Sequence, residues 1–309
     1  ADIFTRGLER YPDSGESANM AFSVALARFS GGEYESALEG FKAYLKDFPN
    51  DRNSIHGQYY LAHSHQVLTQ FEDAGRQFSE LAERYADSNY EEEALFLAGE
   101  NHYNRRDFAT SAVAYQKLLA KYPRGKYAAP AIYALAWSFF EQEMMEEGVG
   151  AMQTLVRDYP DSEFSAKAQF TVGDFHYNLR EYEQALAAYS DLLDQYPDSE
   201  EASPAHSLVA ELNEIGATFE YAKVMELFEA QQYDGAILGF EEITQKYAGT
   251  YTELAAYCNK GLAYEITRRW KQAAESYEQV LEKGGDDLQS ADVVNFAKIH
   301  REWIVENRL

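Results

Sequence analysis

Large and small residues recur along the chain in a pattern typical of α-helices, and the pattern repeats every 37 residues. In each copy a small residue follows a large one by three positions, and another large residue follows four positions later. Residues three, four and seven apart share one face of a helix, so each copy predicts a helix with an apolar stripe. The three columns are Tyr34, Phe71, Phe108, Met145 and Tyr182; Ala37, Ala74, Ser111, Gly148 and Ala185; and Phe4, Phe41, Phe78, Tyr115, Met152 and Tyr189.

A second column of small residues lies twelve positions earlier and predicts another helix in each copy. Its members are Ala25, Ala62, Gly99, Ala136 and Gly173. Each copy therefore predicts a hairpin of two antiparallel helices whose small residues allow close approach. The expected helix pairs are 18–31 and 34–47, 55–68 and 71–84, and 92–104 and 108–121, continuing at the same spacing.

Aromatic residues followed by proline or alanine separate the copies, also at intervals of 37. They are Tyr11-Pro12, Phe48-Pro49, Tyr85-Ala86, Tyr122-Pro123, Tyr159-Pro160 and Tyr196-Pro197, and three of them read Tyr-Pro-Asp-Ser. Proline disfavours helical angles in the preceding residue and so ends the helix. The Asp or Ser that follows is expected to cap the next helix, and Ser88 and Glu91 have the spacing of a capping box.

The separator that follows Tyr196-Pro197 is Tyr247-Ala248, which comes 51 residues later instead of 37. The surplus of 14 residues lies within 200–217. The favoured interpretation is a first helix lengthened by about four turns, from Pro204 toward Gln231. The alternative is a separate short helix that ends at Gly216. Val224 then occupies a position where a small residue is expected.

The repeat boundaries divide the chain into four parts. Residues 1–17 are expected to be half a repeat, 18–199 five regular repeats, 200–286 two further repeats after the insertion, and 287–309 a capping helix. The last segment could instead be the first helix of another repeat. Because Phe4 occupies a second-helix column, we expect the native chain to extend upstream of Ala1.

The columns resemble the tetratricopeptide (TPR) repeat, whose pattern is matched by Gly173, Tyr182, Ala185, Tyr189 and Pro197. The resemblance implies an all-α fold, a right-handed α-solenoid of antiparallel helix pairs. The longer repeat is similar to that of the BamD-like and CpoB-like TPR families of the bacterial cell envelope. That similarity favours the bacterial periplasm, with the cytoplasm as the alternative, and implies binding to other proteins.

Composition narrows the range of partners. The 309 residues carry 52 acidic and 27 basic side chains, a net charge of −25. Such a charge repels nucleic acid and anionic lipid, so we expect no nucleic-acid partner and a basic or apolar segment of a protein instead. No apolar run approaches the ~20 residues of a membrane span, and direct membrane insertion is not expected.

The candidate chemical groups favour structural roles. His65, His102 and His176 follow the repeat spacing and are expected to pack, and the Glu91-Glu92-Glu93 run is expected to be a solvated face. Cys258 is the single cysteine and is expected to be buried. No catalytic motif, cofactor site or metal site is predicted, and the chain is not expected to be an enzyme.

The TPR resemblance also indicates which first-helix residues would line a concave groove. One column holds Phe22, Tyr59, Phe96, Tyr133, Phe170, Tyr221 and Cys258; a second holds Leu26, His63, Glu100, Trp137 and Asp174; a third holds Phe29, Gln66, Tyr103, Phe140 and Tyr177. An aromatic ladder would suit an extended or helical peptide. The alternative is that these bulky residues only fill space between repeats.

Together these observations predict a non-catalytic protein–protein interaction scaffold. It would bind a partner segment through the concave aromatic groove, as part of a bacterial envelope assembly. The alternative is a structural homo-oligomer that stacks end to end through the faces of the solenoid.

Overall fold

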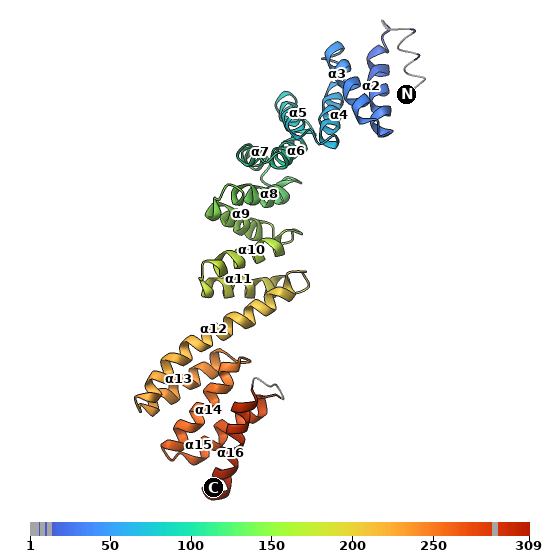
Figure 1. The fold of residues 1–309 in the computed structure, drawn as a ribbon. Coiled ribbons are helices and arrows are strands. Elements are labelled where there is room, and N and C mark those ends of the chain that lie inside the picture. The colour runs from blue at the N-terminus through green and yellow to red at the C-terminus, as the bar shows by residue number, and fades with distance from the viewer. Residues whose placement is uncertain (1–5, 7–9, 11–13, 286–289) are drawn as a thin grey trace. The chain divides into compact units, whose positions relative to one another are not determined.

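The computed structural model describes residues 6, 10, 14–285 and 290–309, and this part of the chain consists of α-helices and connecting turns without a strand. The predicted all-α solenoid is confirmed: within each unit described below, successive helices pack against one another (Figure 1). Phe4 and most of the half repeat predicted for residues 1–17 lie outside the described residues.

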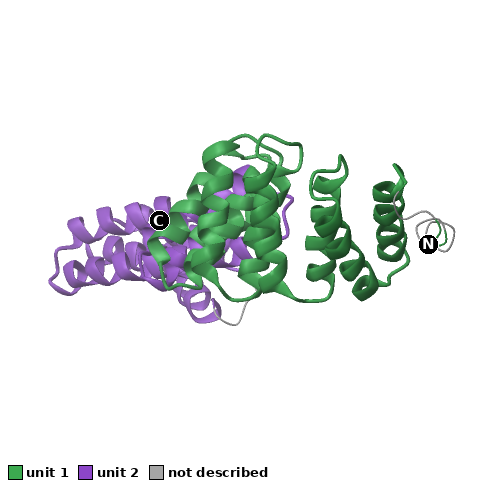
Figure 2. Cartoon of the chain, turned by 90° about the horizontal axis from the view of Figure 1, so that it is seen from above, with its two compact units in different colours: residues 1–172 green, residues 173–309 purple. Residues whose placement is uncertain are grey.

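The chain divides into two compact units, residues 1–172 and 173–309 (Figure 2). The first unit contains α2 (Ser17–Ser30), α3 (Tyr34–Asp47), α4 (Ser54–Val67), α5 (Phe71–Arg84), α6 (Glu91–Asn104), α7 (Phe108–Lys121), α8 (Ala128–Phe140) and α9 (Met145–Asp158). The three helix pairs predicted by number agree with these bounds to within one residue. The boundary between the units falls inside α10 (Ser165–Asn178).

The second unit contains α11 (Tyr182–Gln195), α12 (Ala202–Glu229), α13 (Tyr233–Lys246), α14 (Tyr251–Ile266), α15 (Trp270–Lys283) and α16 (Ala291–Asn307). The 14 surplus residues belong to α12, a single helix of 28 residues that continues through Gly216, as the favoured interpretation predicts. The large Val224 is accommodated by Gly239 of α13, where an added Cβ would lie 2.5 Å from Cγ2 of Val224. In this hairpin the small residue of the contact is therefore on the second helix, α13, and the large one is on the first helix, α12.

The turn inside each hairpin places its central residue in the left-handed region of backbone space. The positions are Gly32, Thr69, Arg106, Glu143, Arg180, Gln231 and Arg268, with φ between 56° and 81°. A left-handed residue after a helix lets the following amide reach back to the last carbonyls, as the Gln70 amide does to the His65 carbonyl at 2.9 Å. Side chains with a Cβ pay a steric cost there, of about 1–2 kcal/mol each.

The turns between hairpins are built from two successive backbone hydrogen bonds. The Tyr159 carbonyl accepts from the Ser162 amide at 2.9 Å, and the Ser162 carbonyl accepts from the Ser165 amide at 3.0 Å. The predicted capping box is wrong. The Ser88 hydroxyl accepts from the Tyr90 amide at 3.3 Å, and a Glu91 carboxylate oxygen accepts from the Asp87 amide at 2.5 Å. These side chains stabilise the turn, whose backbone already ends one helix and starts the next.

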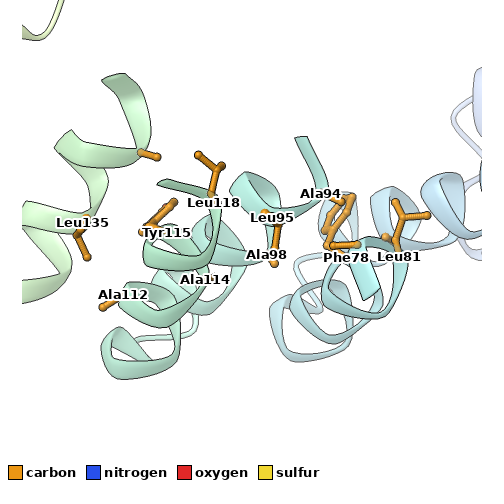
Figure 3. Packing of buried hydrophobic residues seen from close by; sticks show 13 residues of the cluster. Phe78, Leu81, Ala94, Leu95, Ala98, Ala112, Ala114, Tyr115, Leu118 and Leu135 are labelled. Carbon is orange, nitrogen blue, oxygen red and sulfur yellow. The ribbon is translucent and has the colours of Figure 1, made fainter. Parts of the chain in front are cut away.

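Inside a hairpin, the small residue of the first helix meets the large residue sixteen positions later. Tyr115 covers Gly99, Tyr189 covers Gly173 and Tyr277 covers Gly261. Where the large residue is Phe41 or Phe78, the small residue is alanine instead, Ala25 or Ala62. Tyr115 belongs to a continuous core that also contains buried residues of α5, α6 and α8 (Figure 3).

Candidate functional site

The predicted first-helix aromatics of the first unit connect each repeat to the next. Phe22, Tyr59, Phe96 and Tyr133 are all half-buried, on α2, α4, α6 and α8. The Phe96 ring stacks on Tyr127 with ring centroids 5.0 Å apart, and the Tyr133 ring stacks on Phe164 at the same distance. These rings therefore contribute to packing between repeats while part of each remains exposed.

The second ring of each stack belongs to a column that the sequence analysis missed. Tyr90, Tyr127 and Phe164 stand 37 residues apart, and each is the residue immediately before a first helix; the ring centroids of Tyr90 and Tyr59 are 5.0 Å apart. Their spacing of 37 residues is visible in the sequence and could have identified this column. The first repeat breaks the pattern because Asn53 occupies this position, and Phe22 instead contacts His56, with centroids 6.3 Å apart.

Tyr59 and His63 form a packed pair on α4. Their ring centroids are 4.3 Å apart, and His63 also contacts Phe78 of α5 at 5.0 Å. Burial lowers the pKa of His63, so its imidazole is neutral at pH 7. Burial raises the pKa of Tyr59, and its hydroxyl donates to Oε1 of Glu93 at 3.1 Å. The pair therefore packs inside its own hairpin through Phe78 and is joined to the next repeat through Glu93.

Four residues of the predicted groove columns line one pocket. Glu100 and Tyr103 of α6 and Tyr133 and Trp137 of α8 line a hollow of about 340 Å³, together with Asn104, Tyr115 and Ala134. Trp137 is 37% exposed, whereas the other predicted groove residues are half-buried, or buried in the case of Cys258. Trp137 is therefore the predicted side chain most available to a partner.

A second hollow, of about 750 Å³, lies beside the stacked rings of the first unit. Phe96, Tyr127 and Phe164 line it together with the turn residues 158–163. Tyr133 lines the first pocket and stacks on Phe164 of the second. The two hollows are thus adjacent along the first helices, a suitable arrangement for an extended segment.

Three further predicted groove residues, Phe170, Tyr177 and Tyr221, lie on α10 and α12. Phe170 is half-buried on α10. Tyr177 donates its hydroxyl to Oε1 of Glu211 at 2.7 Å, and the Tyr221 hydroxyl is hydrogen-bonded to Asn259. Tyr221 also packs against Phe240, with ring centroids 5.7 Å apart. These two tyrosines link neighbouring helices within the second unit, and neither lines the α6–α8 pocket.

The solvated face predicted for the acidic run at the start of α6 is wrong. Glu91 is buried and accepts hydrogen bonds from Lys121 at 2.7 and 2.8 Å and from the Tyr122 hydroxyl at 2.8 Å. Burial alone would raise the pKa of Glu91, but these bonds and the Asp87 amide lower it below its usual value.

The two carboxylates that follow Glu91 bind across the repeat boundary. Glu92 accepts from the Tyr127 amide at 2.8 Å, and Glu93 accepts from the Tyr59 hydroxyl. At the N-terminus of α6, Glu92 and Glu93 thus connect the helix to the following and the preceding repeat, while Glu91 binds the end of its own hairpin. These contacts are structural, and they hold Tyr59 and Tyr127 in the aromatic columns.

The structure also bears on metal binding, on the Cys258 thiol and on membrane spans. In the described ranges, no set of three or more His, Cys, Asp or Glu side chains is arranged to hold a metal ion. Burial raises the pKa of the Cys258 thiol to about 12, so it is protonated at neutral pH. None of the described helices has the length and apolarity needed to cross a membrane.

Known proteins share sequence or structural features with this chain. A family model described as "YfiO: Outer membrane lipoprotein" matches residues 91–281, more than half of the chain. A TPR protein from Parabacteroides merdae is similar in structure, with a TM-score of 0.48 and 12% identity, over 92% of this chain and 100% of that one. YrrB, described as a TPR protein with an unusual peptide-binding site, has a TM-score of 0.47 and 19% identity, over 66% and 97%. A search of curated proteins finds no match.

Proposed function

The chain belongs to the YfiO family of outer membrane lipoproteins, and from this premise we propose that it is a non-catalytic scaffold of a bacterial envelope assembly. Its partner would be a protein that inserts one segment along the first helices of the first unit. The observation that carries the proposal is the α6–α8 pocket, because four residues of the predicted groove line it and one of them, Trp137, is exposed.

The size and lining of the pocket support a peptide ligand. A hollow of about 340 Å³ is large enough for one or two side chains and lies at the lower end of the range for small-molecule sites. Aromatic side chains commonly anchor protein interfaces because they bury a large area at low entropic cost. The neighbouring hollow at Tyr127 and Phe164 would receive the next part of an extended segment.

Site-specific photocrosslinking tests where the partner binds. p-Benzoylphenylalanine introduced in place of Trp137 should crosslink to a partner protein in envelope preparations of the source organism. The same group in place of Val113, which is 49% exposed on the second helix α7, is the matched control. We expect a specific product at position 137 and none at 113. Crosslinking at 113 alone would contradict binding through the first helices.

The alternative function is self-assembly, and one observation favours it. Ile299 and Trp303 are four residues apart on α16 and are 56% and 42% exposed, which places two large apolar side chains on one helix face. Sedimentation velocity over a hundredfold range of concentration separates the two functions. A scaffold for another protein should keep its monomer mass, whereas end-to-end stacking should give a mass that rises with concentration and falls in a Trp303→Glu variant.

A further inference from the structure

The pocket between α6 and α8 combines aromatic rings with one carboxylate. Glu100, Tyr103 and Asn104 come from α6, Tyr115 from α7, and Tyr133 and Trp137 from α8. The Trp137 ring meets Tyr133 edge-on, with centroids 6.2 Å apart and planes at 72°. These two rings therefore form adjoining walls of the pocket and do not stack face to face.

Glu100 has no partner of opposite charge in the part of the chain that the structure describes. It is half-buried, and among the described residues no hydrogen bond or ion pair joins its carboxylate to another side chain. Burial raises its pKa above the usual value. The nearest arginines in the sequence are engaged elsewhere: Arg105 lies 3.3 Å from Glu72, and Arg106 lies 4.0 Å from Glu141.

The equivalent position two repeats later shows what a purely structural carboxylate does here. Asp174 stands 74 residues after Glu100, and it accepts a hydrogen bond of 2.6 Å from the hydroxyl of Tyr189. Tyr115 is the equivalent of Tyr189, yet no such bond joins it to Glu100, whose side chain is one methylene longer. The carboxylate of Glu100 is left to bind something else.

A cation fits this set of groups. Lysine and arginine side chains are attracted to the faces of aromatic rings within about 6 Å, and tryptophan is the most favourable ring. A half-buried carboxylate adds a charged hydrogen-bond acceptor, which a guanidinium or ammonium group can satisfy. An apolar side chain would leave Glu100 desolvated and unpaired, which is unfavourable. The net charge of −25 further attracts a basic segment.

We propose that the α6–α8 pocket is a cation-binding subsite that receives an arginine or lysine side chain of the partner segment. This inference rests on the proposed function, since it specifies the chemistry of the partner at one point of the groove. Trp137 and Tyr133 contact the cation through their rings, and Glu100 pairs with its charge.

Small probes test the subsite without the partner. N-acetyl-arginine methylamide is titrated into the ¹⁵N-labelled protein, and the indole N–H signal of Trp137 is followed by NMR. N-acetyl-citrulline methylamide has nearly the same shape without the charge. We expect saturable shifts with the arginine probe at millimolar concentration and at least tenfold weaker binding of the citrulline probe. Equal binding of the two probes would overturn the proposal.

Two variants that remove the same charge separate the pocket from the general field of the protein. Glu100→Gln should weaken arginine-probe binding about tenfold, whereas Glu146→Gln, at an exposed position on α9, should leave it unchanged within twofold. Glu100→Gln should also melt at the wild-type temperature or above, because it removes a half-buried unpaired charge. Equal effects of the two variants, or a Glu100→Gln effect that accompanies loss of structure, would overturn the assignment.

The outcomes also separate this inference from the proposed function. If position 137 crosslinks to a partner and Glu100→Gln leaves that crosslink and the arginine titration unchanged, the groove stands and the cation subsite is wrong. If the partner crosslinks only at position 113, the groove is wrong, even if the arginine probe binds at Glu100.

Discussion

Replacing Gly99 by alanine should destabilise the protein, although the same replacement usually stabilises a helix. A Cβ added at Gly99 would lie 2.5 Å from Cε1, 2.7 Å from Cζ and 2.8 Å from Cδ1 of Tyr115. Carbon atoms in contact prefer separations of about 3.5–4.0 Å. Tyr115 is 1% exposed and belongs to the continuous core of α5–α8, so its ring has no free space to enter.

The expected magnitude is the difference between two opposing effects. Alanine is better than glycine in a helix interior by about 1 kcal/mol. Adding a carbon to a well-packed core costs typically about 1–3 kcal/mol, and overlap with three ring atoms places this site toward the upper end. The Gly99→Ala variant should therefore lose about 1–2 kcal/mol of unfolding free energy.

Gly150→Ala is the matched control. Gly150 lies in the interior of α9, in the same unit, and a Cβ there would meet no atom within 4 Å. Only the helix-propensity gain applies, so this variant should be more stable than the wild type by about 1 kcal/mol. The two variants carry the same substitution and should shift stability in opposite directions, about 2–3 kcal/mol apart by the same reasoning.

Urea unfolding followed by circular dichroism at 222 nm measures the difference. Repeat arrays can unfold in parts, so the slope of the transition must be compared as well as its midpoint. If Gly99→Ala is stabilised as much as Gly150→Ala, the Tyr115 ring moves freely, and the pairing of glycine with tyrosine in these hairpins has no packing cause.

Two other predictions concern charge and backbone. Glu91→Gln should lower the unfolding free energy by about 1–3 kcal/mol at pH 7, because it weakens the charged hydrogen bonds from Lys121 and Tyr122. The pKa of Glu91 is lowered in the folded state, so its stabilisation is present above about pH 4.5 and is lost as the pH falls through the folded pKa. Urea titrations should therefore show a smaller difference in unfolding free energy between wild type and variant at pH 3 than at pH 7. An equal difference at both pH values would contradict this. Glu143→Gly should raise the unfolding free energy by about 0.5–1 kcal/mol, because φ is 61° there and glycine adopts this angle without strain. A melting temperature below that of the wild type would show that the Glu143 side chain stabilises the protein by more than the backbone strain costs.

The helices and their pairing could be predicted because they depend on short, constant separations along the chain. The sixteen-residue step from Gly99 to Tyr115 lies within one hairpin, and the hairpin turn is the same in each copy. Helix periodicity and a fixed turn therefore determine which residues meet. The continuous helix across the 14-residue insertion follows from the same rule, since Pro204 can start a helix and the apolar spacing persists beyond it.

The candidate groove could be predicted only as a set of columns. The sequence indicated that Tyr103, Tyr133 and Trp137 belong to first helices of neighbouring repeats, but it did not show that they share a pocket with Glu100. Nor did it show that Tyr59 would be occupied by contacts with His63 and Glu93. Both outcomes depend on how closely one hairpin packs on the next and on the reach of individual side chains.

The sequence by itself determined the repeat, the helices, the turns and the small-to-large contacts inside each hairpin, because all of these are local and recur with one period. Only the tertiary structure decided which long side chains meet, both between hairpins and across the two helices of one hairpin. It stacked Phe96 on Tyr127, directed Glu91 to Lys121, and left Glu100 without the tyrosine bond that Asp174 receives. The physical reason is that periodicity specifies which face of a helix a residue occupies, whereas contact across an interface depends on side-chain length and on the partners already engaged there.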